Sequence, residues 1–292
     1  MKQTAFSICL ILFLSCLGGP AGAMELDVTG GGNFLTFHPQ KLTAYSDPAS
    51  AMKQFQPYPF IIGSIGLKDD ISETLSYNIR LSRDSILRNS VEGTLSLRTD
   101  NFSLEFGPFI GMTDTLEMPF MGMLGSIGFT YPGIVFFSLS ASSNLTRLGF
   151  TSDHTRESAA VKIGFWMPFM IPSFTASYKN FTQQISETHF IQDSLTRLQV
   201  SIDFHGKNFP ITIRLDGGYQ VYSRFYSHLG NEYSDTLNSF FAGGEISWQL
   251  RNQTKITIGA ELPVIINAAS PMTAPLFFTM PKITAGFVYT FK

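Results

Sequence analysis

The fold is decided by the stretch Phe240-Phe241-Ala242-Gly243-Gly244-Glu245-Ile246-Ser247-Trp248-Gln249-Leu250, then Arg251-Asn252-Gln253-Thr254, then Lys255-Ile256-Thr257-Ile258-Gly259-Ala260-Glu261-Leu262. On both sides of the polar turn, every second side chain is apolar, and those between are small, polar or charged. Side chains of a β-strand alternate between two faces. A period of two therefore predicts a hairpin with one apolar face and one polar face.

The same alternation recurs along the chain and predicts fourteen strands, with twelve as the alternative count. Strands of about ten residues match a tilted crossing of a bilayer. An even number of strands leaves both chain ends on the same side, as in outer-membrane barrels. The predicted strands are Leu26–Phe37, Tyr58–Leu67, Ile71–Ser82, Val91–Arg98, Phe102–Gly111, Met121–Thr130, Ile134–Ser142, Ser158–Met167, Ser173–Gln184, Ser194–Phe204, Ile211–Tyr222, Phe240–Leu250, Lys255–Leu262 and Met280–Phe291.

The composition also favours a membrane protein. Hydrophobic residues make up 44% of the 292 residues, 28 of them are Phe, and only 14% are charged. Soluble domains carry roughly 25% charged residues. Outside the N-terminus, the chain has no apolar run long enough for a transmembrane helix, which needs about 18 residues. These features indicate an all-β, transmembrane, antiparallel up-and-down β-barrel, with a secreted β-sandwich as the alternative that composition leaves open.

Connector lengths decide between these two folds. The predicted connections alternate between short turns, such as Lys68–Asp70, and longer ones. Outer-membrane barrels alternate short periplasmic turns with longer outer loops, whereas a sandwich with Greek-key links need not. The long connectors are predicted at His38–Pro57, Arg83–Ser90, Met112–Phe120, Ser143–Glu157, Ile185–Asp193, Ser223–Asp235 and Ile265–Thr279.

The N-terminus predicts export. Met1-Lys2 is a short basic segment, Ala5 to Leu17 is apolar, and Ala21-Gly22-Ala23 resembles a signal-peptidase site. We expect a signal peptide over residues 1–23 and a barrel domain over residues 24–292. Both cysteines, Cys9 and Cys16, lie in this leader, so we expect no disulfide in the mature protein. An alternative makes Cys16 a lipid-modified first residue.

The last strand carries a resemblance to a known class. Phe287-Val288-Tyr289-Thr290-Phe291 resembles the alternating, phenylalanine-ended closing strand of bacterial outer-membrane barrels, although Lys292 follows it. The resemblance implies an outer-membrane location and recognition of this strand by the barrel-assembly machinery. In size and strand number the chain is similar to monomeric fourteen-stranded porins. Outer-membrane lipid is then the expected partner, and the sequence leaves the oligomeric state open.

A second resemblance concerns the segment before the second strand. Ser46-Asp47-Pro48-Ala49-Ser50-Ala51-Met52 is similar to the Pro-Ala segment near the N-terminus of long-chain fatty-acid transporters. If His38–Pro57 folds inward as a plug, this resemblance implies a hydrophobic ligand. A surface adhesin is the third possibility.

Charged residues on the polar face of a barrel point into the lumen, because a lipid-facing Arg or Lys costs about 2–4 kcal/mol near the midplane. We expect them to line a water-filled channel for passive diffusion of small polar solutes or ions. A lumen closed by salt bridges is the alternative. The predicted pore-lining residues are Arg80, Glu92, Arg98, Glu105, Lys162, Lys179, Arg197, Asp203, Arg214, Asp216, Glu245, Lys255 and Glu261, together with Lys282.

Other chemistry is poorly supported by the sequence. All five histidines fall in predicted connectors without ligand spacing, so we expect no metal site and no cofactor. The sequence contains no motif of a catalytic nucleophile, so we expect no enzymatic activity. The net charge of −2 predicts no nucleic-acid partner. Aromatic residues near strand ends are expected in interfacial girdles, namely Tyr58, Phe120, Tyr131, Trp166, Tyr178, Phe204, Tyr222, Trp248 and Tyr289.

Overall fold

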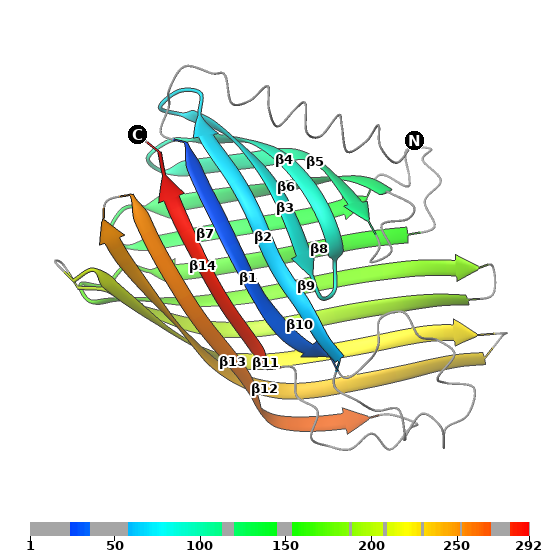
Figure 1. Cartoon of the computed structure of the whole chain (residues 1–292). Helices are drawn as coiled ribbons and strands as arrows, with labels where there is room; N and C mark the ends of the chain where they lie inside the picture. Colours follow the sequence, from blue (N-terminus) through cyan, green and yellow to red (C-terminus); the bar gives the residue numbers. More distant parts are fainter. Residues whose placement is uncertain are drawn as a thin grey trace.

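The computed structural model is a closed antiparallel barrel in which each strand pairs with its neighbours in chain order (Figure 1). It describes residues 24–35, 58–112, 120–144, 154–186, 189–206, 209–228, 231–251, 253–269 and 281–291. The predicted up-and-down barrel of fourteen strands is therefore confirmed. The strands are β1 Glu25–Leu35, β2 Tyr58–Asp70, β3 Leu75–Asp84, β4 Arg88–Arg98, β5 Phe102–Met112, β6 Phe120–Tyr131, β7 Val135–Asn144, β8 His154–Phe165, β9 Met170–Ser186, β10 His189–Phe204, β11 Ile211–His228, β12 Asn231–Arg251, β13 Thr254–Ala269 and β14 Lys282–Thr290.

The barrel closes through β1, which contains three consecutive glycines, Gly30 to Gly32. β1 pairs with β14 from Glu25↔Thr290 to Asn33↔Lys282, and on its other side with β2. Beyond the ladder, the Phe291 amide donates to the Met24 carbonyl at 2.7 Å. Both described ends of the chain thus lie at one end of the barrel, which we call the turn end. The opposite end is called the loop end.

Several connections differ in place or length from those that the sequence predicts. The segment Lys68–Asp70 belongs to β2, and the chain turns over residues 71–74, where the Ile71 amide donates to the Leu75 carbonyl at 2.8 Å. Most of Ile185–Asp193 and Ser223–Asp235 is strand, because the β9–β10 and β11–β12 ladders continue almost to the tips of their hairpins. These outer segments carry polar side chains on both faces, so they pair through their backbones without the alternation that marks a strand in a sequence.

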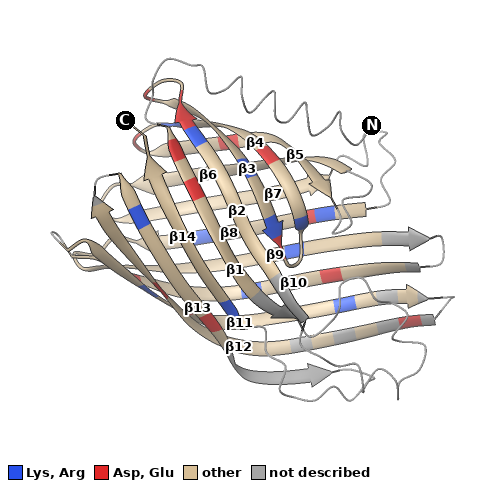
Figure 2. Ribbon diagram, in the orientation of Figure 1, with Lys and Arg blue, Asp and Glu red and all other residues tan. Residues whose placement is uncertain are grey.

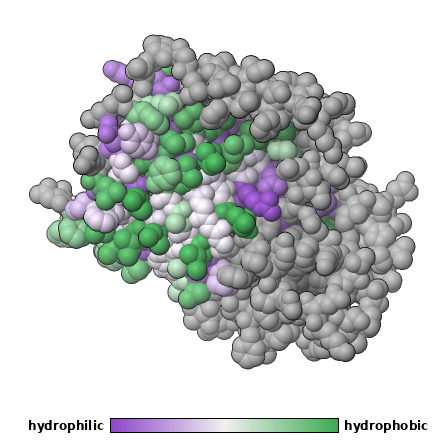
Figure 3. Space-filling model, viewed as in Figure 1, coloured by the Kyte–Doolittle hydropathy of each residue, from purple (hydrophilic) through white to green (hydrophobic). Residues whose placement is uncertain are grey.

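The outer wall of the barrel is apolar. Ile213, Ile246 and Ile258 lie side by side on β11, β12 and β13 and are 42%, 55% and 61% exposed. Figure 3 shows apolar residues over much of the described wall in that view. The predicted alternation is correct here, since Thr212 and Ser247 on the same strands line an internal cavity. An apolar surface of this extent is what a wall facing hydrocarbon presents.

The predicted aromatic girdles are correct only in part. Tyr131, Trp166 and Trp248 are exposed on the wall, as expected. Phe120 and Tyr222, which were also assigned to girdles, are buried inside the barrel. The reason is parity, because Phe120 pairs with Gly111 on the inward face, where the absence of a Cβ leaves room for its ring.

Candidate functional site in the barrel lumen

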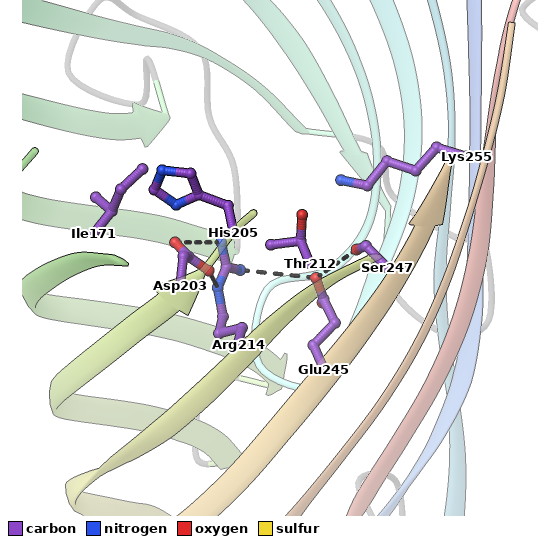
Figure 4. Close-up of a pocket in the computed structure, with 8 residues that line it drawn as sticks. All are labelled: Ile171, Asp203, His205, Thr212, Arg214, Glu245, Ser247 and Lys255. Atoms are coloured by element: carbon purple, nitrogen blue, oxygen red, sulfur yellow. Dashed lines mark hydrogen bonds and ion pairs between the residues drawn. The ribbon is translucent and has the colours of Figure 1, made fainter. Parts of the chain in front are cut away.

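Most of the predicted pore-lining residues lie around a cavity of about 640 Å³ inside the barrel. Asp203, Arg214, Glu245 and Lys255 line an adjoining space of about 260 Å³ (Figure 4), and Arg98 and Asp203 line a third of about 590 Å³. The residues of the predicted set on the largest cavity are Arg80, Glu92, Lys179, Arg197, Arg214, Asp216, Glu245, Glu261 and Lys282.

Glu105 and Lys162 line none of these three cavities, although both lie on inward-facing positions of their ladders. Glu105 accepts a hydrogen bond from Thr94 Oγ1 at 2.6 Å. The Lys162 ammonium lies 5.5 Å from the centre of the Phe136 ring. Both side chains are therefore engaged with the inner wall.

Basic and acidic residues are interleaved along the strands (Figure 2), and residues of both signs line the lumen cavity. Arg214 of β11 contacts Asp203 of β10 at 2.6 Å and Glu245 of β12 at 4.0 Å, and Figure 4 shows the three together. Arg197 of β10 makes two bonds to Glu261 of β13, at 2.9 and 2.6 Å, although two strands separate them. Paired charges keep the lumen polar without giving it a strong net field.

The turn between β3 and β4 lies inside the lumen. Ile86 and Leu87, at its tip, are only 2% and 7% exposed. In Figure 1 the turn lies over β9 and β10. The two side chains pack in a cluster with inward-facing aromatic residues of four other strands, which are Phe109 of β5, Phe120 of β6, Phe181 of β9 and Tyr222 of β11. This apolar cluster is enclosed by the wall, and we call the residues Asp84 to Arg88 the inner turn.

Ion pairs fasten both ends of the inner turn to the far wall. Asp84 Oδ2 lies 2.5 Å from Lys179 Nζ on β9, and Arg88 Nη2 lies 2.7 Å from Asp193 Oδ2 on β10. These strands are on the other side of the barrel from β3 and β4 in the ring of strands. The inner turn is thus held across the lumen by charge as well as by apolar contact.

Asp193 is the centre of the most deeply buried polar network. Its two oxygens accept bonds from Arg224 Nε and Nη2 at 2.7 and 2.8 Å, and from the Tyr222 hydroxyl at 2.7 Å. Arg88 completes the set, and the side chains of Arg88 and Asp193 are 3% and 2% exposed. Removing one partner of such a buried pair costs about 3–5 kcal/mol, because the other charge is left uncompensated.

The inner turn has internal hydrogen bonds of its own. Asp84 Oδ1 accepts from the backbone amides of Ile86 and Leu87 at 2.8 and 3.0 Å. Arg88 Nη1 donates to the Ser85 carbonyl at 2.8 Å. Arg88 has a φ of 62°, in the left-handed region that a tight turn needs and that L-residues rarely adopt. Local side-chain bonds of this kind stabilise a turn independently of its surroundings.

A further ion pair in the lumen joins β8 to β4. Arg156 Nη2 donates to Glu92 Oε1 on β4 at 2.9 Å, and the guanidinium lies 4.4 Å from the centre of the Phe109 ring. His154, two residues earlier, is 3% exposed and its ring lies 6.0 Å from that of Phe120. The prediction that every histidine lies in a connector is therefore wrong for His154, His189 and His228, because β8, β10 and β11 extend further than their alternation indicates.

The sequence placed the inner turn in an outer connector, Arg83–Ser90, and this assignment is wrong. Two adjacent apolar residues at the tip of a short connection were the available signal, since solvent-exposed tips favour Gly, Asn and Asp. Phenylalanines on the otherwise polar face, at 109 and 181, were a second signal. The plug predicted at His38–Pro57 lies outside the described residues, as does the signal peptide at residues 1–23.

The described residues contain no group of three or more His, Cys, Asp or Glu that could hold a metal ion. Within the same residues, no helix is long and apolar enough to cross a membrane.

No protein-family model and no curated protein sequence matches the chain. Solved structures resemble it in overall shape. OmpT, an outer membrane protein of Vibrio cholerae, is 10% identical with a TM-score of 0.43, over 94% of this chain and 99% of that one. An outer membrane channel from Pseudomonas putida F1 is 7% identical with a TM-score of 0.46, over 94% and 97%. The NanC porin is 11% identical with a TM-score of 0.37, over 91% and 100%. Each likeness concerns the barrel architecture alone.

Proposed function

We propose that this protein is an outer-membrane channel for passive diffusion of small polar solutes or ions. The observation that carries the proposal is a polar, charge-lined cavity of about 640 Å³ inside a barrel whose outer wall is apolar. A wall of this kind is stable in a bilayer, where every backbone group must find its partner within the barrel. In this proposal, residues 1–23 direct export and β14 is the segment that the assembly machinery recognises.

The arrangement of charge suggests weak ion selectivity. Around the largest cavity, acidic residues stand next to basic ones, as in the Arg197–Glu261 and Lys179–Asp84 pairs. Rings of one sign select strongly between anions and cations, whereas paired charges do not. We therefore expect a channel that discriminates by size more than by charge.

Conductance in planar bilayers tests the proposal. Residues 24–292, refolded and inserted into a bilayer, should give discrete conductance steps in KCl. A matched preparation of Ile213→Arg, which places a charge against lipid, should insert poorly and give few steps. If the correctly folded wild-type protein conducts nothing, and neither do the variants of the inner turn described below, the protein is not a channel.

A hydrophobic-substrate transporter is the second candidate. It is favoured by the aromatic rings that project into the lumen at 109, 120 and 181, which are almost fully buried against the inner turn and would offer an apolar surface if the inner turn left the wall. Proteoliposomes separate the two candidates. Uptake of a labelled medium-chain fatty acid, without uptake of a small sugar, would support the transporter. Uptake of the sugar alone supports the polar channel.

A further inference from the structure

The structure assigns to the inner turn, Asp84 to Arg88, the role of a gate that sets the size limit of the lumen. This inference rests on the proposed channel function and deepens it. The cavity of about 640 Å³ is lined by Asp84, Ser85, Ile86 and Leu87 of the inner turn. Ile86 and Leu87 also belong to the apolar cluster. The inner turn therefore separates the polar cavity from the apolar cluster and obstructs the lumen between them.

The barrel wall does not need the inner turn in order to close. Each strand pairs with both of its neighbours around the closed ring, and β3 and β4 remain paired up to Asp84↔Arg88. The apolar outer surface is likewise independent of the inner turn. Its contacts across the lumen are therefore available for a role other than holding the wall together.

The contacts of the inner turn fall into two separate sets. The bonds from Asp84 Oδ1 to two amides and from Arg88 to the Ser85 carbonyl shape the turn itself. The bonds to Lys179 and Asp193, and the packing of Ile86 and Leu87, join it to the opposite wall. Because the two sets use different atoms, the inner turn can leave the wall as a folded unit, as a gate must.

The side chains at its tip suit a gate in another way. Packing of Ile86 and Leu87 on aromatic rings excludes water from the obstruction, and a hydrophobic constriction stops ions by dewetting. The cavity beside the inner turn is lined largely by polar side chains, among them Arg80, Lys179 and Gln199. The inner turn therefore places an apolar barrier beside a largely polar cavity.

The first test removes the apolar anchors and leaves the wall unchanged. In liposome swelling, the double variant I86S/L87S should admit a tetrasaccharide that the wild type excludes. Uptake should rise by at least about tenfold, because exposure of two buried apolar side chains shifts a two-state equilibrium by that factor or more. Ser140→Ala, in the wall on β7, leaves both anchors in place and should behave as the wild type. Heat-modifiable gel mobility confirms that each barrel is folded.

The second test locks the inner turn. The only cysteines of the chain lie at positions 9 and 16, before the barrel, so introduced thiols react alone. The variant D84C/K179C lacks the ion pair between positions 84 and 179, so its tetrasaccharide uptake should exceed that of the wild type. Bridging the two cysteines with a reducible bifunctional thiol reagent should lower uptake to the wild-type level. A reductant should cleave the bridge and raise uptake again. In the control S142C/S158C, whose positions face each other in the wall and line none of the three cavities, the bridge should leave uptake unchanged.

The outcomes separate this inference from the proposed function. If the wild type conducts and I86S/L87S has the same size limit, the channel stands and the gate is refuted. If bridging D84C/K179C has no more effect on uptake than bridging S142C/S158C, the gate is also refuted. If the wild type and I86S/L87S are both folded and both silent, the channel itself is refuted, and the gate with it.

Discussion

Arg88 of β4 and Asp193 of β10 form an ion pair across the lumen of the barrel, with Nη2 and Oδ2 2.7 Å apart and both side chains almost fully buried. Arg224 and Tyr222 bond the same carboxylate from the neighbouring strand. A short turn is thereby anchored to the opposite wall at a charged network from which water is excluded. This arrangement explains how a turn of a few residues can hold its place inside the barrel.

The Asp193 network predicts unequal effects of two substitutions. Asp193→Asn removes the charge that two buried arginines share, and should lower the free energy of unfolding by about 3–5 kcal/mol. Tyr222→Phe removes one hydrogen bond to a charged group and should cost about 1.5–3 kcal/mol. The measurement is urea unfolding in lipid vesicles, followed by gel mobility. Equal midpoints for the two variants would contradict the central role of Asp193.

Adjacent side chains of a strand face the lumen and the lipid in turn. An arginine should therefore be tolerated at one position and not at the next. Thr212 lines a lumen cavity and Ile213 is exposed on the outer wall. Thr212→Arg should fold normally, because the new charge enters the lumen. Ile213→Arg should lose about 2–4 kcal/mol of stability in a bilayer. Folding yield in vesicles measures the difference, and a normal yield for Ile213→Arg would mean that this wall does not face lipid.

Gly111 should be intolerant of a methyl group. A Cβ at this position would overlap the ring of Phe120 in the aromatic cluster, whereas a Cβ at Gly30 would meet nothing within 4 Å. Gly111→Ala should therefore lower the free energy of unfolding by about 1–3 kcal/mol, the usual cost of overpacking. Gly30→Ala is the matched control. The cluster would be looser than described if both variants unfolded at the same urea concentration.

Ion selectivity should respond to two lumen arginines. Arg80 and Arg214 both line the largest cavity. Replacing both by Glu changes the lumen charge by 2 × 2 = 4 units and should shift the reversal potential in a KCl gradient towards that of cations. The charge-preserving pair R80K/R214K should keep the wild-type value. A reversal potential that is the same in all three proteins would exclude these side chains from the ion path.

The sequence by itself determined the wall of this barrel. In Lys255–Leu262 and its partner strand, alternation with period two assigned Ile246 and Ile258 to the outside and Glu245 to the inside. The shared location of the described chain ends followed from the even number of strands. These features are local, because a strand side chain points away from its neighbour whatever the rest of the chain does.

Only the tertiary structure decided what occupies the lumen. Asp84 meets Lys179 across 95 residues of sequence, and Arg88 meets Asp193 across 105. The apolar pair Ile86-Leu87 at the tip is a local signal for an inward turn, but no pattern within β3 or β4 says what the turn would contact there. The difference arises because closure of the barrel brings β9, β10 and β11 opposite the turn, and there the side chains of Ile86 and Leu87 find aromatic partners that exclude water.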